Sequence, residues 1–72
     1  MNEIDLHNLT HKQAVEKTED FVLLESESQF FQCRIITGNS PTLQSKITTM
    51  LDKHGFKWYI PTHNLGQIIV VG

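Results

Sequence analysis

Four short segments of the chain are rich in β-branched and aromatic residues, and two longer segments repeat apolar residues at helical spacing. The short segments are predicted to be strands, over residues 3–7, 30–37, 56–61 and 67–71. The longer segments are predicted to be amphipathic helices, over residues 11–27 and 41–54. The elements therefore follow one another in the order βαβαββ.

The starts of both predicted helices carry side chains that cap a helix. Thr10 and Gln13 form the Thr-x-x-Gln pattern of a capping box, in which each side chain bonds the main-chain N–H of the other residue. Ser40 is a favourable N-cap, and Pro41 suits the first helical position because its missing N–H would have no partner there. Gly55 fits the left-handed position that follows a helix.

This order of elements predicts how the strands are arranged. Two successive βα units favour parallel strands joined by right-handed crossovers, which place both helices on the same face of one sheet. The short connection between the last two strands predicts an antiparallel hairpin. We therefore expect a single domain over residues 1–72, a two-layer α/β sandwich with a mixed four-stranded sheet and two helices on one face. If the first two strands are neighbours, His7 and Asn8 lie beside Thr37 and Gly38.

The end of the first strand carries a titratable pair. Alternation places Ile4 and Leu6 on one face, and Asp5 and His7 on the other. Ligands of open α/β sheets bind at this end of the strands. A His there can move protons near neutral pH, and a neighbouring Asp can fix its tautomer. The alternatives are that His7 only satisfies backbone groups at the strand end, and that Asp5 bonds nearby backbone or a neighbouring strand.

A second candidate site is the turn Gly38-Asn39-Ser40-Pro41, which leads into the second helix. The N-terminus of a helix presents free N–H groups and the positive end of the helix dipole, so an anion can bind there. The Ser40 hydroxyl can add a hydrogen bond. The turn lacks the Lys of a phosphate-binding loop. The alternative interpretation is ordinary helix capping.

The segment from Phe56 to Tyr59 alternates aromatic and basic residues. Nucleic-acid bases can stack on such a strand. The alternative is that Phe56 and Trp58 face the core, while Lys57 and Tyr59 face the solvent. Strand alternation favours this alternative.

Charge and composition narrow the functional classes. The net charge of −2 argues against a strongly basic nucleic-acid-binding protein. The charge is uneven, because residues 1–28 have seven acidic side chains against two lysines, while residues 29–72 have four basic side chains against one acidic. The second part can still meet phosphate, whereas the acidic first helix also suits a solvated face or a protein-interaction module.

The cysteine and histidine residues indicate the cellular compartment and whether the chain has a metal site. Cys33 has no partner for a disulfide, and residues 1–3 are polar and acidic, so we expect a reduced, cytoplasmic protein. No apolar run is long enough to span a membrane. The remaining histidines, His11, His54 and His63, are scattered and form no metal-ligand cluster. No metal site is therefore assigned, and the need for a divalent cation stays open.

Three segments together resemble the small MutS-related (Smr) domain family. The first is Ile4-Asp5-Leu6-His7-Asn8, where family members read Leu-Asp-Leu-His-Gly. The second is Arg34-Ile35-Ile36-Thr37-Gly38-Asn39-Ser40, where the family's strand runs into His-Gly-Lys-Gly. The third is Gly66-Gln67-Ile68-Ile69-Val70-Val71, where the family ends on a Gly-x-x-Val-Val-type strand. The resemblance implies a fold like the C-terminal domain of bacterial translation initiation factor three.

The resemblance also implies contact with RNA or DNA, and in several members of the family an endonuclease activity. It implies catalytic roles for Asp5 and His7, and contact with the substrate phosphate by Asn8, Thr37, Gly38, Asn39 and Ser40. The second motif departs from the family, because Thr37 replaces a His, Asn39 a Lys and Ser40 a Gly. Three functions are therefore carried forward: a phosphodiester-cleaving endonuclease, a module that binds nucleic acid without cutting it, and a protein-interaction module. A homo-oligomer or a protein partner also stays open.

Overall fold

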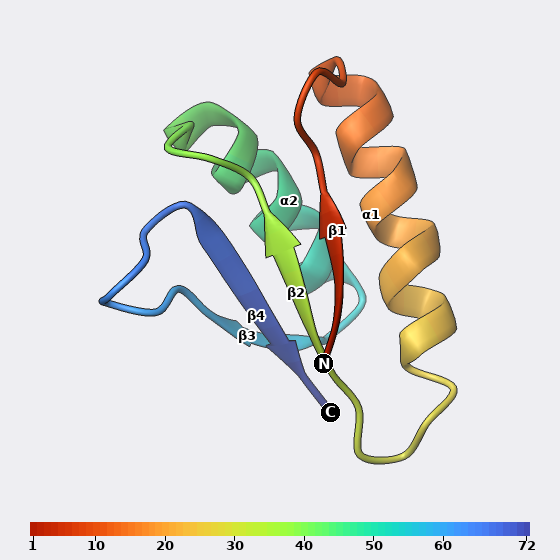
Figure 1. Cartoon of the computed structure of the whole chain (residues 1–72). Coiled ribbons are helices and arrows are strands. Elements are labelled where there is room, and N and C mark those ends of the chain that lie inside the picture. The colour runs from red at the N-terminus through yellow and green to blue at the C-terminus, as the bar shows by residue number, and fades with distance from the viewer.

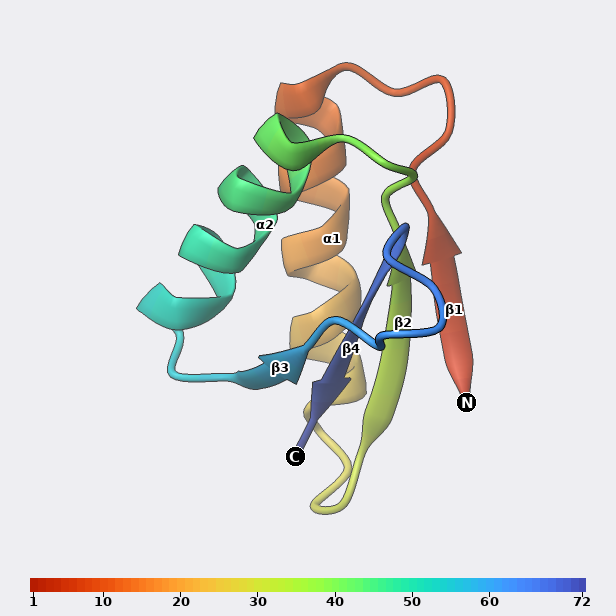
Figure 2. The ribbon, with the colours of Figure 1, turned by 90° about the vertical axis from the view of Figure 1, so that its left-hand side faces the viewer.

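Six elements follow one another in the computed structural model, which describes residues 1–72. They are β1 (Asn2–Asp5), α1 (His11–Glu25), β2 (Gln32–Ile36), α2 (Pro41–Lys53), β3 (Lys57–Tyr59) and β4 (Gln67–Val71). The predicted order βαβαββ is therefore confirmed, and both helices lie on the same face of the sheet (Figures 1 and 2).

The four strands form one mixed sheet in the order β1-β2-β4-β3. β1 and β2 are parallel neighbours, and β3 and β4 form the expected antiparallel hairpin. β4 also pairs antiparallel with β2, so it lies between β2 and β3. The predicted mixed sheet is confirmed.

Three strands and both helices are shorter than predicted. β1 ends at Asp5 rather than residue 7, because the chain turns at Asn8, which has a left-handed φ of 66°. β2 begins at Gln32 rather than residue 30, and Phe30 is left 86% exposed in the preceding turn. β3 covers only residues 57–59 of the predicted 56–61, where Pro61 has no N–H to donate to a partner strand. The helices end at Glu25 and Lys53 rather than at residues 27 and 54.

The predicted helix caps are present. Thr10 Oγ1 accepts from the Gln13 N–H at 3.1 Å, and Gln13 Oε1 accepts from the Thr10 N–H at 3.1 Å. Ser40 Oγ accepts from the Leu43 N–H at 3.3 Å. Gly55 has a φ of 76° just after α2. Each cap satisfies a main-chain group that a helix end leaves unpaired.

The core lies between the sheet and the helices. Its largest fully buried side chains come from the two central strands and both helices, and include Val22, Ile35, Ile47, Leu51 and Ile68. Burial of each such side chain stabilises the fold by roughly 1.5–3 kcal/mol. Phe56 and Trp58 pack against this core, while Lys57 and Tyr59 are exposed, so the core-facing interpretation of the aromatic strand is confirmed.

The face of the sheet away from the helices is partly covered. The segment between β3 and β4 projects toward this face, and its residues 60–63 line a cleft together with Gln67 and Ile69 (Figure 2). Beneath it, Gln67 is only 8% exposed and Ile69 only 4%. Alternation along β4 places these two residues on the face away from Ile68 and Val70, which lie in the core. The loop therefore converts part of an exposed sheet face into a covered one.

Candidate functional site

The C-terminal ends of β1 and β2 lie side by side, so the loops that follow them meet at one end of the sheet (Figure 1). Asp5 pairs with Ile36 in the parallel register, and the Leu6 N–H donates to the Ile36 carbonyl at 3.0 Å. The predicted meeting of His7 with Gly38 is confirmed by a cleft of about 200 Å³. We call this the strand-end cleft, and its lining consists of Asp5, His7, Ile36, Thr37 and Gly38.

Asp5, the last residue of β1, and His7, two residues beyond it, are exposed, whereas Leu6 between them is buried. The Asp5 carboxylate accepts a hydrogen bond from the main-chain N–H of His7 at 2.9 Å. The His7 imidazole makes no hydrogen bond within the chain. Of the two alternatives for Asp5, the contact with nearby main chain is the one present, and the imidazole is open to a ligand.

The second loop is tied to the β3–β4 loop. The Gly66 carbonyl accepts from the N–H groups of both Thr37 and Gly38, each at 2.9 Å. The Thr37 hydroxyl lies 2.8 Å from the Gly38 carbonyl and 3.2 Å from the Gly66 carbonyl. The Gly38 N–H, predicted to be open to an anion, is therefore paired, because the β3–β4 loop places a carbonyl against it.

Main-chain donors remain further along the same loop. The N–H groups of Asn39, Ser40 and Thr42 have no hydrogen-bond partner within the chain. They lie at the N-terminus of α2, where the positive end of the helix dipole adds to their attraction for an anion. The donors available to a phosphate are thus a smaller set than predicted, displaced toward the helix from Gly38.

The comparison with known protein families adds the decisive observation. The family model described as the Smr domain matches residues 4–65, which include both loops of the strand-end cleft. The chain belongs to the Smr domain family. Smr domains are known as nucleic-acid-binding or endonuclease-type domains. No curated protein and no solved structure matches the chain.

The departures from the family's second motif have visible consequences in this Smr domain. Thr37, at the position of the family's His, has its hydroxyl bonded to carbonyls within the fold. Asn39, at the position of the family's Lys, is exposed and uncharged. Asn8, at the position of a family Gly, adopts the left-handed backbone that Asn tolerates better than most residues. The second loop therefore offers main-chain donors without a cation or a proton carrier.

Gln44 supports the loop after β2, although the sequence analysis did not identify it as a site residue. Gln44, in the first turns of α2, donates from Nε2 to the Leu65 carbonyl at 2.6 Å and to Thr37 Oγ1 at 3.1 Å. It lies 3.3 Å from the Gly38 carbonyl as well. Nothing in the local sequence marks this role, because its partners in the β3–β4 loop are 21 positions away. Gln44 and Gly66 together set the position of the second loop.

No three His, Cys, Asp or Glu side chains lie together in an arrangement that could hold a metal ion. His54 instead contacts Glu19, with Nε2 and Oε2 separated by 2.7 Å. Neither helix is long and apolar enough to cross a membrane.

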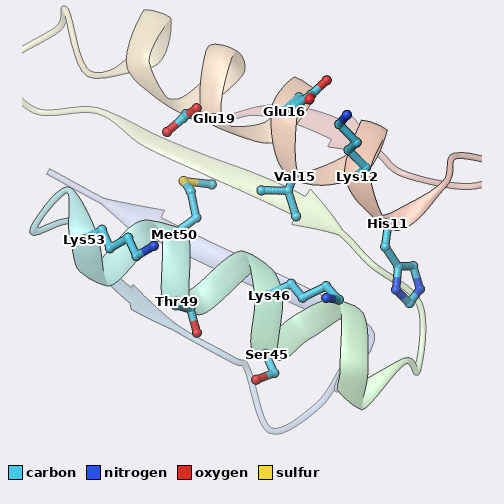
Figure 3. A pocket seen from close by; sticks show the side chains of 10 residues that line it. All are labelled: His11, Lys12, Val15, Glu16, Glu19, Ser45, Lys46, Thr49, Met50 and Lys53. Carbon is cyan, nitrogen blue, oxygen red and sulfur yellow. The ribbon is translucent and has the colours of Figure 1, made fainter.

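The largest hollow of the surface, about 610 Å³, is a groove between α1 and α2 (Figure 3). Its two apolar side chains are Val15 and Met50, one from each helix. The charged side chains along it have both signs, and they are Lys12, Glu16, Glu19, Lys46 and Lys53. This mixture favours neither a polyanion nor a cation, so the groove does not compete with the strand-end cleft as a candidate site.

Proposed function

We propose that this Smr domain binds RNA or DNA, with a backbone phosphate held in the strand-end cleft. The observation that carries the proposal is that the unbonded imidazole of His7 lies in this cleft with Gly38, and that the unpartnered N–H groups of the same loop begin at the next residue, Asn39. Hydrogen bonds from main-chain N–H groups and from histidine fit the oxygens of a phosphodiester. Membership of the Smr family supports this choice of ligand over a free anion.

Electrostatics predicts weak, salt-sensitive binding. The chain has a net charge of −2, and Asp5 itself lines the cleft. Few phosphates can therefore be neutralised, and non-specific affinity is expected at roughly 10⁻⁴–10⁻⁶ M at physiological salt. Lowering the salt concentration strengthens the attraction between exposed charges.

The proposal is for binding without cleavage. His7 is one imidazole that can move a proton, and cleavage by general acid–base catalysis would need a second group for the leaving oxygen. The Thr37 hydroxyl is held by the fold, and the Asp5 carboxylate is bonded to main chain. Cleavage of the phosphodiester by Asp5 and His7 is the second candidate, favoured by the exposed imidazole in the cleft.

The test is a titration followed by NMR, with short single-stranded RNA, single-stranded DNA and duplex DNA at low salt. Binding should shift the amide resonances of residues 5–8, 37–40 and 42. Asn39→Asp places a negative charge beside the unpartnered donors and should weaken binding about tenfold. Ser28→Asp is the matched control, because it adds the same charge in the turn at the opposite end of α1 and should change binding less than twofold.

Incubation of the same nucleic acids with the protein tests cleavage directly. No product is expected from the wild-type chain. Product that disappears in His7→Ala but persists in His11→Ala, an exposed histidine outside the strand-end cleft, would establish the endonuclease instead. Absence of binding to every nucleic acid at low salt would overturn the proposal and leave a protein-interaction module.

A further inference from the structure

A second cleft, of about 490 Å³, opens on the face of the sheet that the helices leave uncovered. The β3–β4 loop forms one wall with Ile60, Pro61 and His63, and Arg34 stands on β2 across from it. The residues of β4 that line it are Gln67 and Ile69. We call this the sheet-face cleft. The proposed phosphate contact does not use it.

Two polar groups at this cleft have no partner. Gln67 is 8% exposed, its side chain makes no hydrogen bond within the chain, and its Oε1 atom is fully buried. Arg34 Nε is also buried without an acceptor, although Nη1 of the same guanidinium lies 3.2 Å from Glu3 Oε1. Buried polar groups in folded proteins nearly always have partners, so two such groups mark this part of the sheet as incompletely paired. The Arg34 side chain is still 37% exposed, so its remaining polar atoms can meet a ligand in the cleft.

These two side chains are close neighbours. Arg34 pairs with Ile69 across β2 and β4, and Gln67 lies two residues before Ile69 on the same face of β4. The cleft therefore offers a guanidinium donor beside an amide that can both donate and accept. A ligand that satisfies both groups must itself carry hydrogen-bond donors and acceptors along one edge.

The rest of the lining selects the shape of the ligand. Tyr59 is 48% exposed at this cleft, and Ile60, Pro61 and Ile69 add apolar surface. A flat ring can lie against an aromatic side chain and an apolar wall while its edge reaches polar groups. A nucleobase has this combination of apolar faces and a polar edge, whereas a phosphate has no face to place against Ile69.

The sheet-face cleft and the strand-end cleft share no lining residue, but neighbouring residues of the sheet connect them. Gln67 pairs with Ile36, and Ile36 pairs with Asp5, so one row of three residues crosses from β4 through β2 to β1. Ile36 and Asp5 line the strand-end cleft, and Gln67 lines the sheet-face cleft. Neighbouring strands are about 4.8 Å apart, so the two clefts are about one nucleotide's reach from each other.

We propose that the sheet-face cleft binds one unpaired nucleobase of the strand whose phosphate occupies the strand-end cleft. The inference rests on the proposed function and deepens it, because it assigns the substrate class as single-stranded nucleic acid. The faces and edge of a base are free together only outside a duplex. Tyr59 supplies the stacking surface, and Gln67 and Arg34 bond the edge of the base.

The experiment measures binding by fluorescence anisotropy at low salt with three labelled probes of equal length. They are a single-stranded oligonucleotide, an abasic strand with the same phosphates, and a duplex. The wild-type chain should bind the single strand about tenfold more tightly than the abasic strand. Tyr59→Leu and Gln67→Leu should each remove this preference and leave binding of the abasic strand unchanged.

Two controls separate a binding role from a structural one. Phe30→Leu removes an aromatic ring that is 86% exposed but lies outside both clefts, and it should leave all three affinities unchanged. Gln67→Leu removes a buried unpartnered amide, so the variant should be at least as stable as the wild type. If that variant does not fold, the side-chain amide resonance of Gln67 in the wild-type chain gives the answer, because it should shift with the single strand and not with the abasic one.

The outcomes distinguish the two proposals. Equal binding of the single strand and the abasic strand, with Asn39→Asp still weakening both, would overturn the nucleobase site and leave the phosphate contact standing. A duplex that binds as tightly as the single strand, with no effect of Tyr59→Leu, would also overturn the nucleobase site and leave the phosphate contact standing. No binding of any probe would overturn the proposed function and the nucleobase site together.

Discussion

Asp5 and His7 are joined by a hydrogen bond from the main-chain N–H of His7 to the Asp5 carboxylate, at 2.9 Å. The carboxylate therefore stabilises the turn out of β1 without touching the imidazole. This turn sets the direction from which His7 enters the strand-end cleft, so Asp5 acts on the site through the backbone.

Replacement of Asp5 should therefore affect stability. Asp5→Ala removes the acceptor and should lower the free energy of unfolding by about 1 kcal/mol. Asp5→Asn keeps an acceptor oxygen and should lower it by less than half as much. Urea unfolding of the three proteins measures the difference, and equal stability of wild type and Asp5→Ala would show that the hydrogen bond contributes nothing.

The side chain of Gln44 links α2 to both loops beside it, through contacts with Thr37 and Leu65. Gln44→Ala should lower the free energy of unfolding by about 1–2 kcal/mol, because it leaves two carbonyls and a hydroxyl with fewer partners. Amide hydrogen exchange at Thr37 and Gly38 should accelerate in this variant, since their shared acceptor lies in the loop that Gln44 holds.

Ser45→Ala is the matched control for Gln44→Ala, because it alters the next residue of the same helix and removes no side-chain hydrogen bond. Its exchange rates at Thr37 and Gly38 should equal those of the wild type. Acceleration in both variants would assign the effect to α2 as a whole.

Thr18 is fully buried on α1, and its hydroxyl has no hydrogen-bond partner within the chain. Thr18→Val replaces the hydroxyl by a methyl group of similar size and should raise the free energy of unfolding by about 1 kcal/mol. Thr18→Ala removes volume as well and should lower it by about 1–2 kcal/mol. Thermal and urea unfolding would rank the three proteins, and a less stable Thr18→Val would show that the hydroxyl has a partner in solution.

Burial raises the pKa of the Cys33 thiol from its ordinary 9.0 to about 11, and the Glu25 carboxylate adds to the rise. A raised pKa in the folded state means that the unfolded chain loses this proton first as the pH increases. The corresponding stability is complete below pH 9 and should be lost between about pH 9 and 11. The loss is on the order of 3 kcal/mol.

Cys33→Ala isolates this contribution from that of other groups that titrate in the same range. Urea unfolding of both proteins at several pH values should show the wild type losing stability relative to the variant above pH 9. Parallel pH profiles for the two proteins would contradict the assignment to Cys33.

Much of the fold could be predicted from local sequence. Capping residues such as Thr10 and Ser40 marked the helix starts, and the order of elements gave the layers and the meeting of His7 with Gly38. These features depend on short-range periodicity and on general rules of connection.

The features of the site that could not be predicted from the sequence depend on contacts between residues far apart in the chain. The pairing of the Gly38 N–H requires the carbonyl of Gly66, and the burial of Gln67 requires the β3–β4 loop to fold over the sheet. Alternation predicts which residues share a strand face, but it does not predict what covers that face. The sheet-face cleft therefore could not be predicted from the sequence, because it depends on the position of the β3–β4 loop.

β4 joins β2 and β3 into one sheet. The last strand in the chain pairs with both β2 and β3, so neither of those strands has its antiparallel neighbour until residues 67–71 arrive. A nascent polypeptide that stops short of these residues presents two open strand edges and an incomplete core, the state that proteases and aggregation remove. Removal of this one strand should therefore destabilise β2 and β3 together rather than a single edge of the sheet.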